Sequence, residues 1–409
     1  VRVGDHYKIS GQKIYITYGE HDMAENIIHL VLARTPDAPE GIKGISLFIV
    51  PKILFNDDGS IDRRNDVRCI SIEKKLGIKG SPTAVLQYGD NGGAIGYLVG
   101  EENKGLEIMF SMMNHARFNV GLQGLAIAER AYQQAVVYAE TRVQGTPLAQ
   151  ETGVPINRHP DVLRLLSVMR SEIDAMRALI FTGANAMDIA DNTVSEVIAD
   201  EQKRASVLIP IIKGWITELS VFHCSNGLQV HGGMGFIEET GAAQYLRDSR
   251  ILPIYEGTTA IQANDLIFRK TIRDEGRTIR NLLDEIETEI ALVDECYSVP
   301  MSNAIAEVRS TLETLLSKAN DSRYLAANSV NWLMQLGYLC GGWMAVKSAD
   351  RAMKNAKDLS DDFVNSKKIC AEIYLQHSLP HVGTFLNVIN HEDNSILNMN
   401  VNWLHRQTA

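Results

Sequence analysis

The sequence predicts an α+β protein that is mostly helical, with an antiparallel β domain followed by a four-helix bundle and an additional C-terminal helical domain. Three observations predict this. The first hundred residues contain short β-rich runs, hydrophobic residues recur three and four apart from Gly105 onward, and that helical spacing continues well beyond Lys270. We expect the three parts to span residues 1–100, 101–272 and 273–409.

Six β-rich runs predict the strands of the first part: 7–10, 13–17, 27–34, 45–50, 67–73 and 84–88. Gly11 between the first two indicates a hairpin. The acidic turn 57–62 predicts a plain hairpin turn, because it lacks the alternating oxygen ligands and the distal Glu of a calcium loop. The glycine-rich stretch 89–100 predicts a loop, because it has no G-x-G-x-x-G between a strand and a helix.

Helical spacing predicts the bundle from three long stretches, 118–138, 161–191 and 195–225, with a loop at 146–160 and a last helix from Ile261 to Lys270. Four more helices are expected at 274–293, 304–318, 326–354 and 361–386, with linkers at 297–303 and 319–324. An apolar stripe in this region favours bundle core or an oligomer interface over a ligand site; it comprises Trp332, Leu333, Leu336, Leu339 and Cys340.

Composition limits the class of protein. The formal net charge of −10 and the absence of basic blocks argue against nucleic-acid binding. Five cysteines with no C-x-x-C pair indicate reduced thiols, as in the cytoplasm, rather than disulfides or zinc. We expect no apolar run long enough to span a bilayer.

The stretch from Leu252 to Gln262 contains the carboxylate best placed for chemistry, Glu256. Apolar neighbours in sequence predict a desolvated site, which favours the neutral carboxyl and suits a general base. Gly257 follows, and the next two threonines are N-cap candidates for the helix after them. The alternative is a structural Glu paired with Arg247 or Arg250.

The glycine cluster of residues 229–236 is the second candidate. Glycines let the backbone approach a ligand and offer N–H groups to phosphate, although a helix C-cap and turn would use the same residues. Nearby His223, Cys224 and His231 lack a fourth ligand and the usual metal spacing, which favours a packing or polar role.

Three motifs in this order resemble the flavin-dependent acyl-CoA dehydrogenase family: Gln-Val-His-Gly-Gly-Met-Gly-Phe at 229–236, Leu-Arg-Asp-Ser-Arg at 246–250 and Ile-Tyr-Glu-Gly-Thr at 254–258. The resemblance covers about residues 4–270. The helices after it resemble those of the larger bacterial branch of the family.

The resemblance implies an FAD-dependent oxidoreductase of fatty acid metabolism in which Glu256 removes the α-proton of an acyl-CoA while hydride leaves the β-carbon for flavin N5. Some members place the base just before a helical arginine, but here Ala116 precedes Arg117. Arg117 and Asn114 match substrate contacts. The implied FAD contacts are Tyr15, Thr17, Arg142, Gln144, Gln229, Gly232, Gly233 and Thr258, of which Arg142 and Gln144 commonly act from a neighbouring subunit.

Partners and alternatives follow from the same resemblance. It implies electron-transfer flavoprotein as electron acceptor and a homodimer or homotetramer. An acyl-CoA oxidase would share the proton and hydride steps but pass electrons to oxygen. A complete member has a helical domain and part of the β domain before the point matched by Val1. The chain is therefore also compatible with a truncated product, half of a split enzyme, or a non-catalytic oligomerisation module.

Overall fold

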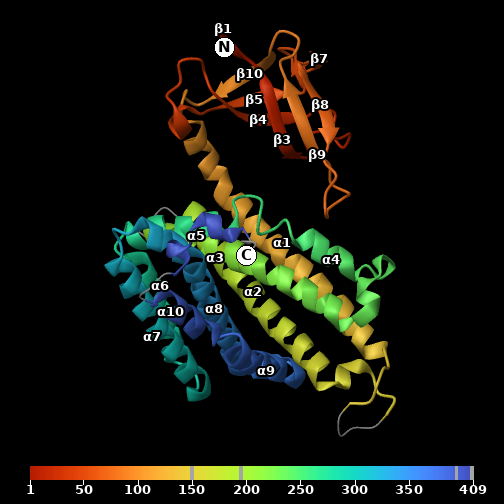
Figure 1. Cartoon of the computed structure of the whole chain (residues 1–409), viewed down its shortest axis with the longest axis vertical. Helices are drawn as coiled ribbons and strands as arrows, with labels where there is room; N and C mark the ends of the chain where they lie inside the picture. The colour runs from red at the N-terminus through yellow and green to blue at the C-terminus, as the bar shows by residue number, and fades with distance from the viewer. Residues whose placement is uncertain (148–151, 193–196, 392–394, 406–409) are drawn as a thin grey trace. The chain divides into compact units, whose positions relative to one another are not determined.

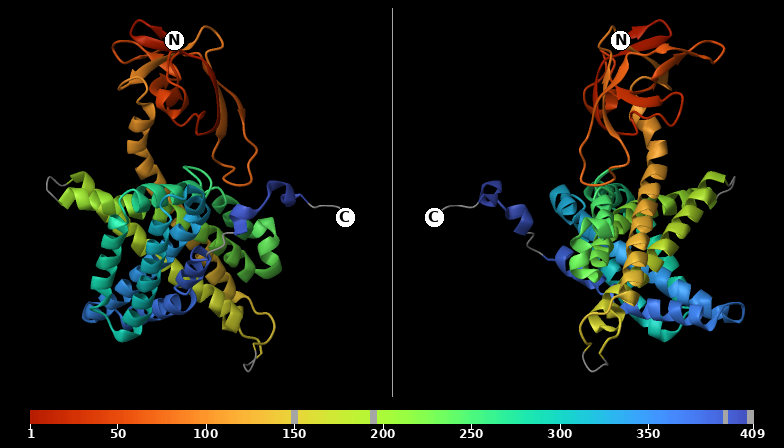
Figure 2. Two further views of the ribbon diagram at one scale, coloured as in Figure 1. Left: turned by 60° about the vertical axis from the view of Figure 1, so that its left-hand side comes forward. Right: turned by 90° about the vertical axis from the view of Figure 1, so that its right-hand side faces the viewer.

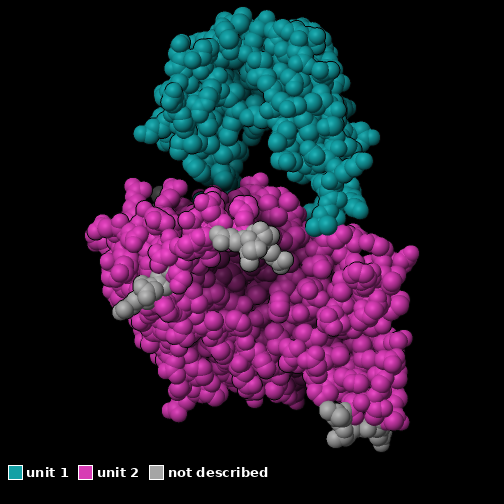
Figure 3. Space-filling model, in the orientation of Figure 1, with its two compact units in different colours: residues 1–116 teal, residues 117–409 magenta. Residues whose placement is uncertain are grey.

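The computed structural model describes residues 1–147, 152–192, 197–391 and 395–405. It forms two compact units, residues 1–116 and 117–409 (Figure 3). The first contains all the strands, and the second is helical (Figure 1). This confirms the prediction of a mostly helical α+β fold.

Unit 1 contains antiparallel strands in three sheets. One has the order β1-β2-β10-β5-β4, the second β3-β9-β8, and the third pairs β6 with β7. The bounds in chain order are β1 Arg2–Val3, β2 His6–Ile9, β3 Gly11–Thr17, β4 Ile28–Ala33, β5 Ser46–Pro51, β6 Ile53–Phe55, β7 Ile61–Arg64, β8 Val67–Ile72, β9 Thr83–Tyr88 and β10 Ala94–Val99.

All six predicted strands are present, but two predictions about their neighbours are wrong. Gly11 does not join a hairpin, because β2 pairs with β1 and β10 whereas β3 pairs with β9. The stretch 89–100 is not entirely loop, because β10 crosses it and pairs with β2 and β5. The acidic turn does join a hairpin, in which β6 pairs with β7 and Asp58 accepts a hydrogen bond from the Ser60 amide.

The helices begin with α1 Gly105–Thr141, which contains the boundary between the units. The others are α2 Pro160–Asn192, α3 Val197–Val230, α4 Ala242–Ser249, α5 Thr259–Asn264, the π-helical η5 Asp265–Ile272, α6 Arg277–Ile290, α7 Glu295–Ser317, α8 Ser322–Lys354, α9 Asp361–His377, α10 His381–Ile389 and α11 Ser395–Asn398. Short 3-10 turns include η3 Gly232–Phe236 and η4 Glu238–Thr240.

The predicted helices are present with shifted ends. The linker expected at 297–303 is wrong, because α7 begins at Glu295 and contains Pro300. The stretch 361–386 is two helices, with a break between His377 and His381. Part of the third predicted stretch, residues 195–196, lies outside the described residues. The expectation of no apolar run of membrane-spanning length is also wrong, because residues 199–230 are long and apolar enough by length and composition. The most apolar part of this segment is 78% buried inside the fold, as in a core helix.

Helix α3 packs against the other helices of the bundle and also against the C-terminal helices (Figure 2). A Cβ added at Gly337 of α8 would lie 2.3 Å from the ring of Trp215, so only a glycine permits this close approach. Leu333, one turn earlier on α8, packs over Gly214 in the same way. The apolar stripe is therefore core: its five members, from Trp332 to Cys340, are fully buried. One continuous core includes helices on both sides of residue 272. The three-part domain division remains a prediction.

The shared core predicts a large effect of Leu333→Ala. Truncating a fully buried leucine removes apolar contacts and leaves a cavity, which should lower the free energy of unfolding by about 2–5 kcal/mol. Urea unfolding followed by circular dichroism measures this. The control is Val330→Ala on the same helix, where the side chain is 36% exposed. Equal effects of the two changes would contradict the shared core.

Candidate active site

The turn that contains Glu256 lies between α4 and α5. Its chain folds back through backbone bonds from the Tyr255 amide to the Ile251 carbonyl and from the Thr259 amide to the Pro253 carbonyl, at 3.1 and 3.0 Å. Thr258 caps α5 by accepting a hydrogen bond from the Ile261 amide at 3.3 Å. This confirms the predicted N-cap and fixes where the helix begins.

Glu256 itself has left-handed backbone, with φ 54°. Non-glycine residues seldom adopt this conformation, and where they do the surrounding structure must hold them there. Gly257 follows with φ 88°, so two consecutive residues have positive φ. The turn therefore projects its carboxylate from a backbone that its neighbours must stabilise.

The side chain of Glu256 is exposed, which corrects the prediction of an apolar wall. Leu252 points into the core at 3% exposure, but Ile254 is 46% exposed and does not cover the carboxylate. The structural alternative of an ion pair with Arg247 is also wrong: Arg247 pairs with Glu238 at 2.8 Å. Within the described ranges, no cation lies within 4 Å of the Glu256 carboxylate. The carboxylate is thus free to meet a ligand.

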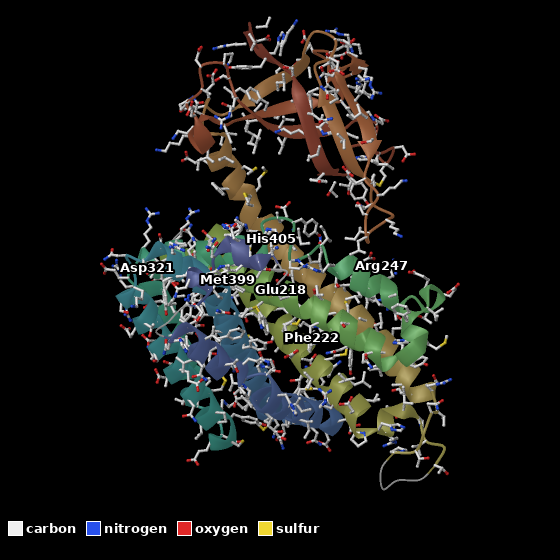
Figure 4. All side chains as sticks on the ribbon, in the orientation of Figure 1. Glu218, Phe222, Arg247, Asp321, Met399 and His405 are labelled. Atoms are coloured by element: carbon white, nitrogen blue, oxygen red, sulfur yellow. The ribbon has the colours of Figure 1, made fainter. Side chains whose placement is uncertain are left out.

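Three polar side chains that the sequence did not single out hold this turn. Lys213 of α3 is fully buried and donates a hydrogen bond to the Gly257 carbonyl at 2.6 Å. Gln262 donates to the Glu256 and Gly257 carbonyls at 3.2 and 3.3 Å. Glu218, labelled on α3 in Figure 4, accepts from the Thr259 hydroxyl at 2.5 Å. The sequence feature that could have indicated Lys213 was a lone lysine inside the apolar run of α3.

Burial lowers the pKa of Lys213 to about 8, because desolvation of the ammonium outweighs the favourable charges of Glu218 and Glu256. Arg117 of α1 lies close enough to lower it further. Burial also raises the pKa of the Tyr255 hydroxyl, with Glu256 as a second cause. Tyr255 donates a hydrogen bond to Gln123 of α1. The turn therefore sits among α1, α3 and α5.

The proposed substrate contacts are both on α1, three residues apart. Arg117 is 8% exposed and lies 4.0 Å from the Asp265 carboxylate, but its Nε has no hydrogen-bond partner among the described residues. An unpaired buried donor of this kind is costly and favours a ligand acceptor. Asn114 is exposed. Ala116 leaves no carboxylate before Arg117.

Residues 232–236 of the glycine cluster form η3, which follows the C-terminal end of α3, whereas Lys213 lies near the middle of that helix. Gly232 has φ 58°, and a Cβ added at Gly232 or Gly233 would meet no atom within 4 Å. Gln229 is exposed beside them. The helix C-cap alternative is compatible with the positive φ, but the open space at both glycines leaves their backbone accessible.

The end of α1 lies beside this cluster. The Tyr138 ring stacks on the His231 ring, with 4.5 Å between the ring centroids. His231 Nδ1 forms a hydrogen bond with the Gly227 carbonyl at 2.7 Å. Arg142 and Gln144 are exposed and bond to each other at 3.2 Å. His223 and Cys224 are fully buried, and His223 pairs with Glu172 at 3.0 Å. Their predicted packing or polar role is confirmed.

Unit 2 thus contains two groups of predicted site residues, far apart along its helices. Arg117 and Arg142 are 25 positions apart on or just after α1, which corresponds to roughly 37 Å at 1.5 Å per residue. Tyr15 and Thr17 belong to unit 1, on β3. Tyr15 is 69% exposed with φ 61°, at a bulge where the register between β3 and β9 shifts.

Comparison with known proteins identifies the family. Residues 103–270 match the model for the acyl-CoA dehydrogenase C-terminal domain, and residues 282–400 match the acetyl-CoA dehydrogenase C-terminal-like domain. The chain therefore belongs to the acyl-CoA dehydrogenase family. This confirms the resemblance, including the additional C-terminal helical part.

Particular relatives agree. The chain is 49% identical over 383 residues to the 3-methylmercaptopropionyl-CoA dehydrogenase of Ruegeria pomeroyi, covering 91% of this chain and 65% of the relative. It is 34% identical to the broad-specificity linear acyl-CoA dehydrogenase FadE5 of Mycobacterium tuberculosis, covering 96% and 69%. The chain thus spans about two thirds of the length of these curated relatives.

A solved structure shares the fold. The acyl-CoA dehydrogenase of Bacillus anthracis complexed with FAD matches 99% of this chain and 68% of its own, with a TM-score of 0.74 and 24% identity. At this identity the likeness concerns the fold alone.

The cap at Thr258 gives a test of the turn. Thr258→Ala removes the acceptor of the Ile261 amide and should lower the free energy of unfolding by about 0.5–2 kcal/mol. Thr258→Ser keeps the hydroxyl and should restore most of it. Urea unfolding of the three proteins measures the difference. If the alanine and serine variants were equally stable, Thr258 would not act as the cap.

Proposed function

We propose that the chain provides the base and part of the flavin site of an FAD-dependent acyl-CoA dehydrogenase, which forms the α,β double bond of an acyl-CoA thioester. The supporting observation is the exposed carboxylate of Glu256, which stands on a strained turn and has no ion partner in the part of the chain that the structure describes. The substrate is first sought among short thioesters, beginning with 3-methylmercaptopropionyl-CoA, because that compound is in the name of a relative 49% identical to this chain.

Different residues of the chain have different roles in the proposed reaction. The α-hydrogen of a thioester is weakly acidic, so Glu256 takes it as a proton while the thioester carbonyl is held by hydrogen-bond donors. Arg117, whose buried Nε has no partner among the described residues, and Asn114 bind the CoA-bearing substrate. When bound, FAD supplies the acceptor for the hydride that leaves the β-carbon.

The residues present fit a flavin dinucleotide. Gly232 and Gly233 leave open space where a Cβ would stand, so a ligand can lie against their backbone. Tyr15 presents an exposed aromatic face at a bulge, and Thr17 lies on the same strand. Gln229, Arg142, Gln144 and Thr258 are likewise exposed and offer hydrogen-bonding groups.

The separation along α1 supports the proposed homodimer or homotetramer. Arg117 and Arg142 lie roughly 37 Å apart along the helix. We therefore propose that they act in different active sites, and that each active site uses Arg142 and Gln144 of a second copy of the chain. Phe236, the last residue of the glycine cluster, is 84% exposed, as an interface residue of a free chain would be. We also propose electron-transfer flavoprotein as acceptor and a cytoplasmic location, with which the five free cysteines are compatible.

Replacing Glu256 by Gln tests the base. The protein, reconstituted with FAD, is mixed anaerobically with a panel of acyl-CoA thioesters while the visible flavin spectrum is recorded. Glu256→Gln should retain the flavin bands and lose their bleaching, by about 10²-fold or more, because an amide cannot take the proton. Peroxide formed in air would indicate an oxidase.

The matched control is Glu275→Gln, which changes another exposed carboxylate with left-handed backbone, φ 58°, in the same unit. It should bleach like the unchanged chain. Normal bleaching by Glu256→Gln would remove Glu256 from the proton step. A chain that takes up no FAD would favour the non-catalytic alternative.

Gly233→Val tests the flavin cradle without disturbing the fold. Gly233 has no positive φ and no atom within 4 Å of an added Cβ, so valine should leave the melting temperature nearly unchanged. Its branched side chain should nevertheless fill the space that a ligand would use and weaken FAD binding by about tenfold or more. Fluorescence titration of FAD measures this. Unchanged affinity would contradict a flavin contact at this glycine.

A further inference from the structure

We infer that Lys213 is a positioning residue for Glu256, holding the strained turn through the Gly257 carbonyl. This inference rests on the proposed function for its kinetic consequence. No motif and no relative's name points to Lys213; the contacts of its ammonium group do.

The first argument is its burial. Lys213 is fully buried in an otherwise apolar stretch of α3, with Ile211 and Ile212 before it and Trp215 after it, all at 0% exposure. An ammonium group in such surroundings costs free energy unless it is paired and hydrogen-bonded. Among the described residues, its ammonium donates one hydrogen bond, to the Gly257 carbonyl of the turn at 2.6 Å. A buried cation of the core helix α3 thus bonds to this turn.

The second argument is what that bond restrains. The carbonyl of Gly257 belongs to the residue directly after Glu256, and both residues have positive φ. Left-handed backbone at a glutamate is costly and persists only where neighbours over-determine it. Gln262 donates to the Glu256 and Gly257 carbonyls at 3.2 and 3.3 Å. Of the side-chain bonds to these two carbonyls, that from Lys213 is the shortest.

The third argument is charge. The groups that face Lys213 are Glu218 on its own helix, Glu256 on the turn and Arg117 on α1. Glu218 is already engaged by the Thr259 hydroxyl. A charged donor makes a stronger hydrogen bond to a carbonyl than a neutral donor does. The charge of Lys213 therefore strengthens its bond to the Gly257 carbonyl.

The experiment uses the full chain with FAD and compares Lys213→Met, Lys213→Arg and Lys203→Met. Lys203 lies on the same helix, but its side chain is 60% exposed and pairs with Asp200. Lys213→Met should slow flavin bleaching by about tenfold or more, the effect of one lost charge-assisted hydrogen bond. Lys203→Met should leave the bleaching rate unchanged. Lys213→Arg keeps a charged donor and should retain most of the bleaching rate of the unchanged chain.

A measurement without FAD distinguishes the positioning role of Lys213 from the proposed dehydrogenase function. Hydrogen exchange of the apo chain over residues 252–262 should be faster in Lys213→Met than in Lys203→Met, because the turn loses a restraint. If the unchanged chain did not bleach, the proposed function would fall, and faster exchange would still support the positioning role. Unchanged exchange together with unchanged bleaching in Lys213→Met would overturn it.

If Lys213→Met did not bind FAD or did not fold, Lys213→Arg would provide the test. Hydrogen exchange over residues 252–262 as slow as in the unchanged chain, together with retained bleaching, would then support the inference, because a charged donor is retained. Slow bleaching in an arginine variant whose exchange is unchanged would overturn it.

Discussion

The packing of α3 is the constraint on which unit 2 depends. Trp215 fits against Gly337 of α8 on one side, and Ile212 lies against Gly121 of α1 on another. A helix enclosed in this way can pair its buried polar groups only inside the protein. Thr217 and Ser220 do so locally, by bonding to carbonyls of their own helix. Lys213 is too long for that solution and reaches the Gly257 carbonyl, so the packing of the core also fixes the turn that contains Glu256.

Backbone strain marks two of the residues implied by the family resemblance, Tyr15 and Glu256. Both are non-glycine residues with positive φ, and both are exposed. The strain contributes nothing to stability, so each needs a local device that maintains it. At Tyr15 the device is the register shift between β3 and β9. At Glu256 it is the set of hydrogen bonds from Lys213 and Gln262. Strained residues that face outward are typical of sites where geometry is kept for a ligand.

The sequence predicted what depends on local periodicity and failed where distant partners decide. Alternation located six strands, but the partner of β2 is β10, some ninety residues away, and no local signal at Gly11 could indicate that. Helical spacing located the helices, whereas the linker expected at 297–303 is part of α7. The motif around Glu256 predicted the turn and its cap. Its exposure could not be predicted, because a sequence does not show that Leu252 turns inward while Ile254 turns outward. Lys213 was missed for the same reason: its partner is 44 positions away.

The exposure of Glu256 changes how the proposed chemistry must work. A carboxylate in water is well solvated and a weak base, and nothing on the turn itself desolvates it. Under the proposed function, the covering must come from what binds over the turn: the acyl chain, the flavin ring and further protein. The thioester would then strengthen its own base by excluding water from it, so that binding and proton removal are coupled. Lys213 keeps the turn in place while this covering forms, because its buried ammonium holds the Gly257 carbonyl. The buried cation and the exposed carboxylate are thus parts of one arrangement, the first holding the turn and the second facing the ligand.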